Sequence, residues 1–199
     1  MFWNPFFKEE FKHAINNCNN SSIPGPDKLL WNYLKTILKQ DKCLNNIVNI
    51  TNACINLGYW PSHFKKLSTI VIPKPNKQSY DHPKSFHPIM LLNMLGKLIK
   101  KIIGEKLQFQ VAVNDFIHPS QLGELKFKST TNTGVALMHI ICLGWVKNLS
   151  TSTLVFNIAQ FFPSLNHHFL TCILQKVGLD SCIVKFFTNY LIDRKTNYV

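Results

Sequence analysis

The stretch TLVFNIAQFFPSLNHHFL, residues 153–170, decides the expected fold class. Its first seven residues, 153–159, are rich in apolar and β-branched side chains, and this composition predicts a buried strand. Pro163 then begins a helical pattern that continues to Val177 and is ended by Gly178. A strand followed closely by a helix indicates that this part of the chain mixes both kinds of element.

The flanking sequence adds more helices than strands. Apolar residues at helical spacing predict helices over 29–38, 43–57, 94–107, 131–147 and 181–191. Asp27, in the turn SSIPGPD, is the candidate N-cap of the first of these helices. LSTIVIP, residues 67–73, predicts a buried strand, and the proline- and lysine-rich residues 73–88 predict a loop. KTNYV, residues 195–199, has the composition of a strand but no turn or partner, so we expect an α+β fold that is C-terminally truncated.

Composition restricts the classes of function. The chain has 199 residues, 46% of them hydrophobic, and a formal net charge of +12, which favours an anionic partner such as nucleic acid. The cationic side chains are almost all lysines, with Arg194 as the single arginine. The six cysteines have no metal or redox spacing and indicate a reducing compartment. Without a signal peptide or an apolar run long enough to span a membrane, we expect an intracellular protein, nuclear or cytoplasmic.

Four segments resemble the reverse transcriptases of LINE-like (non-LTR) retrotransposons, especially those of fungal type. They are PGPDKLLWNYLK (24–35), IVIPKPNKQSYDHPKSFHPIMLLNMLGKLIKKII (70–103), HPSQLGELKFKSTTN (118–132) and FNIAQFFPSLNHHFL (156–170), the last followed by FFTNYLIDRKTNYV (186–199). The resemblance implies a right-hand polymerase fold with an N-terminal helical extension at 1–23, fingers at 24–150 and a partial palm at 151–199. The palm part would hold its first strand and helix only.

The resemblance also implies partners and a cofactor. The family copies an RNA template onto a DNA primer with two Mg²⁺ ions, which palm carboxylates hold. Asn157 stands where the family has the first metal-binding aspartate, and the later aspartate pair has no counterpart in this sequence. Ile158 would offer its backbone carbonyl to the nucleotide, and Phe162 matches the aromatic gate against a ribose 2′-hydroxyl. We therefore expect this chain to bind no metal pair and to be catalytically inactive.

Basic residues of the fingers provide the remaining candidates. The resemblance implies that Lys74 contacts the nucleotide triphosphate. His87 stands where the family has an arginine that pairs with the triphosphate, and the histidine cannot make that arginine's bidentate hydrogen bonds. Lys77 and Lys84 are candidates for nucleic-acid contact, and an ordinary solvated loop is the alternative for all three lysines. Asn157 likewise has the alternative of a satisfied buried amide, and Phe162 that of a packing residue.

The segment QLGELKFKST adds two further candidate contacts to nucleic acid, Lys126 and Lys128. A capping role for Ser129 or Thr130 is an equal alternative for the polar residues beside them. Glu124 stands where the family has the second glycine of a pair. Lys65 and Lys66 are interpreted as surface residues.

Two other interpretations stand beside a truncated reverse transcriptase. One is a non-enzymatic, basic nucleic-acid-binding fragment, and the other is a product without function. The changes at Glu124, His87 and Asn157 can each arise from a single G-to-A transition, which suggests a decaying copy of a mobile element.

Overall fold

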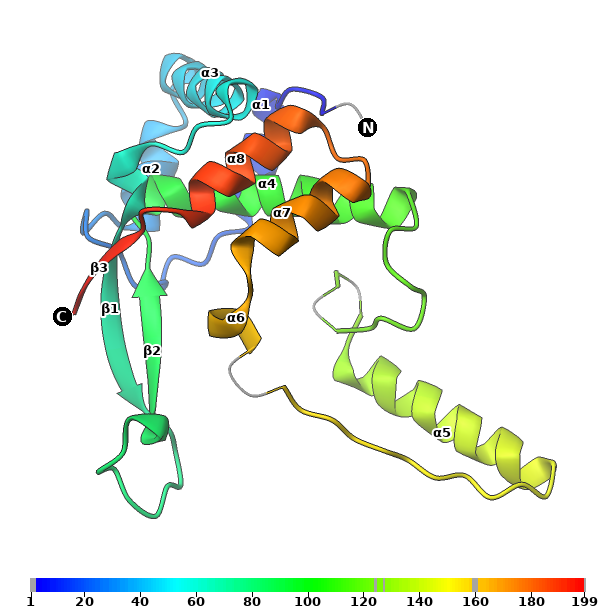
Figure 1. The fold of residues 1–199 in the computed structure, drawn as a ribbon. Coiled ribbons are helices and arrows are strands. Elements are labelled where there is room, and N and C mark those ends of the chain that lie inside the picture. The colour runs from blue at the N-terminus through cyan, green and yellow to red at the C-terminus, as the bar shows by residue number, and fades with distance from the viewer. Residues whose placement is uncertain (1–2, 124, 127, 159–160, 199) are drawn as a thin grey trace. The chain divides into compact units, whose positions relative to one another are not determined.

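The computed structural model describes residues 3–123, 125, 126, 128–158 and 161–198 (Figure 1). The chain divides into two compact units. The first unit comprises Met1–Ile103 and Asn166–Val199, and the second unit comprises Gly104–Leu165. The mixed helical and strand content confirms the expected α+β class.

Helices form most of the first unit. They are α1 (Lys8–Asn16), α2 (Trp31–Ile37), α3 (Asp41–Leu57), the beginning of α4 (Met94–Val113), α7 (His167–Lys176) and α8 (Ser181–Leu191), with short 3₁₀ turns η1 (Ser62–Lys65) and η2 (Pro83–Ser85). Helix α8 packs against α3 and α7, and α1 packs against α3 (Figure 1). The predicted stripe of α4 supplies buried Leu98, Ile99, Ile102 and Ile103. A buried aromatic contact joins Trp60 to Phe186, with ring centroids 5.5 Å apart.

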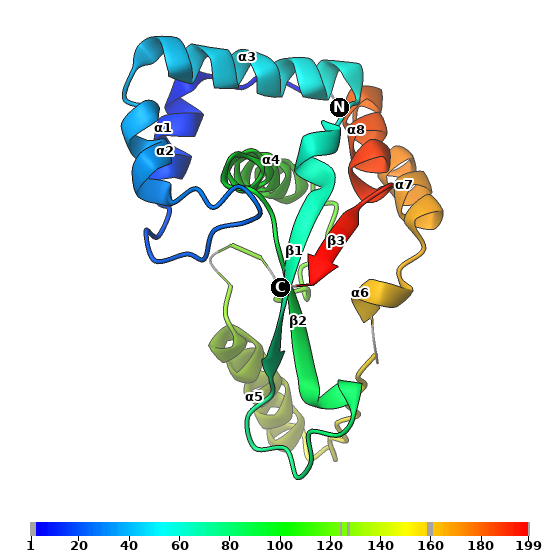
Figure 2. The same cartoon turned by 90° about the vertical axis from the view of Figure 1, so that its left-hand side faces the viewer.

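The sheet of the first unit has three strands in the order β2-β1-β3. Strand β1 (Lys66–Pro73) pairs antiparallel with β2 (Phe86–Leu91) and parallel with β3 (Lys195–Tyr198), as Figure 2 shows. The expectation that the C-terminal strand has no partner is therefore wrong. The loop predicted over 73–88 is also too long, because β2 already begins at Phe86. The proline in β2 weakens its strand pattern in the sequence, and the hydrogen bonds made by pairing with β1 stabilise the strand.

The strand predicted over 153–159 is not formed. Residues 153–158 adopt no regular structure and are exposed, and residue 159 lies outside the described residues. An isolated strand leaves its backbone groups and one side-chain face without partners, and the three described strands pair with one another instead. The helix predicted from Pro163 is divided into α6 (Phe161–Ser164) and α7, whose N-cap Asn166 accepts a hydrogen bond from the Phe169 N–H.

The turn PGPD fixes the N-terminus of α4. The prediction that Asp27 caps the helix that follows it is wrong. Its Oδ2 instead accepts a 2.7 Å hydrogen bond from the Met94 N–H at the first residue of α4. Gly25 lies so close to this point that a Cβ there would be 1.9 Å from the Leu92 carbonyl oxygen. The glycine is therefore required by a close approach of two backbone segments.

The second unit contains the end of α4, α5 (Thr130–Val146) and α6. The helix predicted over 131–147 is confirmed, and Ser129 caps it by accepting a hydrogen bond from the Asn132 N–H. None of the residues of α5 is buried. Throughout the described residues, every helix is too short or too polar to cross a lipid bilayer.

Candidate nucleic-acid interface

Four of the predicted site residues lie together on the β1–β2 hairpin. Lys74, Lys77 and Lys84 are in the loop that joins the two strands, and His87 is the second residue of β2. All except Lys74, which is half-buried, are exposed. The order of the strands explains the grouping, since antiparallel pairing returns the chain to the same end of the sheet.

Internal hydrogen bonds hold the hairpin loop. The Lys74 N–H donates to the Ser85 carbonyl at 2.8 Å, and the Ser85 hydroxyl donates to the Ser79 carbonyl at 2.7 Å. The Tyr80 hydroxyl donates to the Lys74 carbonyl at 2.8 Å, and its ring contacts that of Phe86, with centroids 5.9 Å apart. These contacts join both ends of the loop to its middle, so its lysines extend from a folded support.

The Lys74 ammonium is positioned by the backbone of the same loop. Its Nζ donates to the Lys84 carbonyl oxygen at 2.8 Å. A lysine has three N–H donors, so two remain for an anion. The loop also carries Asp81, whose carboxylate accepts a 2.6 Å hydrogen bond from the Ser79 hydroxyl. Three lysines against one carboxylate leave the loop with a positive charge that suits a phosphate group.

His87 lies on one face of the sheet, opposite Ile72 of β1. The other face of the same hairpin contains a hollow of about 400 Å³, which sequence reasoning missed. Residues of both strands and of the loop line it: Val71, Asp81, His82, Pro83, Phe86 and Pro88. The alternation of side chains along β2 places Phe86 and Pro88 on the face opposite to His87. The hollow and His87 therefore cannot serve one small ligand.

Lys126 and Lys128 lie in the second unit. They line a hollow of about 500 Å³ with residues of α4 and of the segment that follows it, including Phe109, Ile117 and His118. The hollow also contains the acidic residues Glu105 and Asp115, so its charge is mixed. The Glu124 substitution lies outside the described residues.

The three palm candidates are in the second unit as well. Asn157, Ile158 and Phe162 are exposed, the last two by 67% and 79% of their surface. The alternative of a buried amide at Asn157 is therefore wrong. Phe162 contacts Phe161, with ring centroids 5.4 Å apart.

The side chain of Asn157 is not suited to bind a pair of divalent cations. A carboxamide offers one neutral oxygen, whereas hard Mg²⁺ is held by carboxylates and water. Among the described residues, no three His, Cys, Asp or Glu side chains are grouped closely enough to hold a metal ion. The neutral amide therefore does not replace the anionic ligand that such a metal pair requires.

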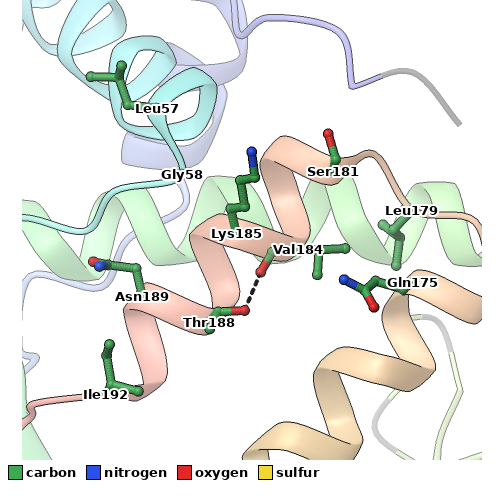
Figure 3. Close-up of a pocket in the computed structure, with 10 residues that line it drawn as sticks. All are labelled: Leu57, Gly58, Gln175, Leu179, Ser181, Val184, Lys185, Thr188, Asn189 and Ile192. Carbon is green, nitrogen blue, oxygen red and sulfur yellow. Dashed lines mark hydrogen bonds between the residues drawn. The ribbon is translucent and has the colours of Figure 1, made fainter.

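A further pocket lies between the end of α3 and α8, remote in sequence from every predicted site residue (Figure 3). Its volume is about 480 Å³. The side chain of Lys185 projects from α8 beside Gly58, and Thr188 uses its hydroxyl internally, donating to the Val184 carbonyl at 2.8 Å (Figure 3). The ten lining residues include no carboxylate, thiol or imidazole, so this pocket has no acid–base partner of those kinds for the hydroxyls of Ser181 and Thr188.

The chain is similar to RNA-directed DNA polymerases of non-LTR retrotransposons. It is 22% identical over 194 residues, 98% of its length, to the retrovirus-related Pol polyprotein from the type-1 retrotransposable element R2 of Popillia japonica. It is 34% identical over 120 residues, 60% of its length, to the RNA-directed DNA polymerase from the mobile element jockey of Drosophila funebris.

The similarity is limited in extent. The chain spans 25% of the length of the R2 polyprotein and 13% of that of the jockey polymerase. No protein-family model matches it. These relatives come from insects and do not support the fungal type expected from the sequence.

Proposed function

We propose that this chain forms the fingers and the beginning of the palm of a retrotransposon RNA-directed DNA polymerase. The boundaries are those expected from the sequence: fingers at 24–150 and partial palm at 151–199, after a helical extension at 1–23. The observation that carries the proposal is similarity along 98% of the chain to a retrotransposon Pol polyprotein. In this role the partners are an RNA template and a DNA primer.

The β1–β2 hairpin supplies the contacts to phosphate. Lys74 binds the incoming triphosphate with the two ammonium protons that its bond to Lys84 leaves free. Lys77 and Lys84 add exposed charge on the same loop. His87 contributes a weaker contact than arginine, because an imidazole has no two-pronged donor.

For the palm segment, we propose that the chain has lost its catalytic activity. A metal-bridging carboxylate stabilises developing charge, and its replacement by the neutral amide of Asn157 removes that interaction. A deficit of about 1.4 kcal/mol in the transition state already costs tenfold in rate. We therefore propose that this chain binds nucleic acid without extending a primer, and the roles of Ile158 and Phe162 are limited to nucleotide contact.

Salt-dependent binding tests the hairpin. Lys74, Lys77 and Lys84 are changed together to glutamine, and affinity for a fluorescent RNA is measured by anisotropy at several salt concentrations. Each lost phosphate contact lowers the slope of log K against log salt by about 0.7 for a single strand, so we expect a decrease of about 2. The matched control changes Lys12, Lys39 and Lys42, which are exposed on the helical part of the first unit. Equal slopes for the two triple variants would contradict the hairpin site.

The second candidate function is a non-enzymatic basic binder. The net charge of +12 favours it, and so does the amide at Asn157. A deoxynucleoside triphosphate separates the two candidates, since a polymerase fragment binds it through Lys74 whereas a general polyanion binder prefers the longer RNA. Loss of triphosphate binding in Lys74→Gln, with RNA binding retained, supports the polymerase fragment.

A further inference from the structure

Two lysines stand side by side at the other end of the sheet from the hairpin loop. The parallel register of β1 and β3 pairs Lys66 with Lys195, and both side chains are exposed. Paired residues project to the same face, and neighbouring strands are only ~4.8 Å apart. The ammonium groups therefore share one small area of surface at the start of β1 and β3, the two strands that lie side by side in Figure 2.

Like charges in this position are unfavourable unless an anion lies between them. Within the described part of the chain, neither Lys66 nor Lys195 has a carboxylate at ion-pair distance. Arg194, the residue before Lys195, is not part of this pair, because its guanidinium lies 4.7 Å from the centre of the Tyr190 ring of α8. Asp193, which precedes it, forms no ion pair with a described residue.

The same face of the sheet continues to the hairpin. Alternation and register assign to it Lys66, Ser68, Ile70 and Ile72 of β1, His87, Ile89 and Leu91 of β2, and Lys195 and Asn197 of β3. We call this the Lys66 face. Ser68 and Asn197 are paired polar residues next to the two lysines. From Lys66 to Ile72, the partner of His87, the strand extends about 20 Å, a length that spans several phosphates of a nucleic-acid strand.

We propose that Lys66 and Lys195 bind the phosphodiester backbone of a nucleic-acid strand that follows the Lys66 face. The choice of ligand rests on the proposed function, but the site is separate from the hairpin lysines. The ligand neutralises the juxtaposed charges, and the sheet holds both lysines at a fixed spacing. Sequence reasoning interpreted Lys66 as ordinary surface, because its neighbour Lys195 is known only from the strand register.

The test is the salt dependence of binding to an RNA of about 20 nucleotides and to DNA of the same sequence. In the variant Lys66→Gln/Lys195→Gln we expect the slope of log K against log salt to fall by about 1.4 and the affinity at low salt to fall about tenfold. The charge-matched control Lys39→Gln/Lys42→Gln should keep the slope of the native chain. A slope equal to that of this control would overturn the proposal, and the RNA and DNA arms identify the preferred strand.

A charge-reversal variant distinguishes loss of the binding site from a folding defect. Lys195→Glu places opposite charges across the strand pair, so its urea midpoint should not fall below that of the native chain. Its affinity for RNA should nevertheless fall further than that of Lys42→Glu. Equal losses in the two single variants would overturn the site even if the chain is fully folded.

The hairpin variant distinguishes this proposal from the proposed function. If the lysines of the hairpin lower the slope and Lys66 and Lys195 do not, the Lys66 site is wrong and the polymerase assignment stands. If only Lys66 and Lys195 lower it, the site stands and the hairpin assignment is wrong.

Discussion

The side chain at position 157 decides what the proposed palm segment can do. Asn157 is exposed and lies in a segment without regular structure, so no neighbouring strand brings a carboxylate to it. Among the described residues, no three His, Cys, Asp or Glu side chains are grouped closely enough to hold a metal ion around this amide or elsewhere.

Restoring one carboxylate should therefore not restore synthesis. For Asn157→Asp in the 199-residue chain we expect no primer extension on poly(rA)·oligo(dT) with Mg²⁺ or Mn²⁺, since two cations need several shared carboxylates. The native chain, which we also expect to be inactive, is the control. Incorporation of labelled nucleotide by either protein would contradict the proposed inactivity.

Cys182 offers a prediction that depends on pH. Burial raises the pKa of its thiol to about 11, and the nearby Asp180 carboxylate adds to this increase. Because the thiolate is the reactive form, alkylation of Cys182 by iodoacetamide should keep accelerating from pH 9 towards pH 11. A rate that reaches its plateau below pH 9, measured by mass spectrometry of the labelled peptide, would contradict this pKa.

The variant Asp180→Asn measures how much the Asp180 carboxylate raises the pKa of Cys182. Asn retains the side-chain oxygen that accepts the Cys182 N–H at 3.0 Å, so the cap of α8 should survive. Without the negative charge the pKa of Cys182 should fall, and alkylation at pH 9 should become several-fold faster. The exposed Cys142, labelled in the same sample, controls for reagent concentration.

At the scale of elements, the turn PGPD is a connector between segments distant in sequence. Its Asp27 satisfies the first N–H of α4, and its Gly25 packs against the backbone at Leu92. A second contact joins the same two segments, because the Nζ of Lys97 in α4 donates to the Ile23 carbonyl. The turn and the start of α4 should therefore unfold together.

Changes in this turn should lower the free energy of unfolding of the first unit. We expect Asp27→Ala to cost about 1 kcal/mol, as for the loss of a helix cap, and Asp27→Asn to cost less. Gly25→Ala should cost more, because its Cβ would overlap a backbone carbonyl. Urea denaturation followed by circular dichroism measures all three. Gly104→Ala, whose Cβ meets open space within α4, is the control and should be neutral or stabilising.

The sequence predicted elements whose signals are local. The apolar stripe of α4 and the end of α3 at Leu57 were both readable, and α3 ends there because Gly58 adopts a left-handed φ of 62°. Contacts between distant segments were not readable. Lys101, for example, donates to the Ala14 and Asn17 carbonyls at the end of α1, at 3.2 and 3.0 Å, and no pattern along the chain pairs these residues.

The same distinction applies to the candidate site. The lysines of the hairpin are close in sequence, so their grouping could be predicted. Strand β2 was missed because Pro88 and the flanking polar residues weaken its pattern, and β1 stabilises it through pairing. The strand predicted around Asn157 had the right composition but found no partner, which a local pattern cannot supply.

At the scale of the whole molecule, the two units differ in how much they bury. The first unit has an aromatic and aliphatic core around Trp60, Phe186 and α4. In the second unit, α5 is apolar around its circumference and yet exposes large side chains such as Trp145 and Val146, by 64% and 81%. Elements with few buried contacts open more readily than elements of a core.

Hydrogen exchange should reveal this difference. We expect the amides of α5 to exchange well before those of α8 and of residues 94–103 in α4. Mass spectrometry of peptic peptides at neutral pH measures the order. Protection of α5 equal to that of α8 would show that another surface covers this helix in solution.

The parallel pairing of Lys66 with Lys195 has a consequence for biosynthesis. A ribosome delivers β1 and β2 early, then must translate the whole second unit and two more helices before β3 emerges. Throughout that interval one edge of β1 is unpaired, and such an edge invites association with other nascent chains. Strand β3 can pair with this edge only after the second unit has been made, so a chaperone engaged before residue 195 should have its greatest effect on yield.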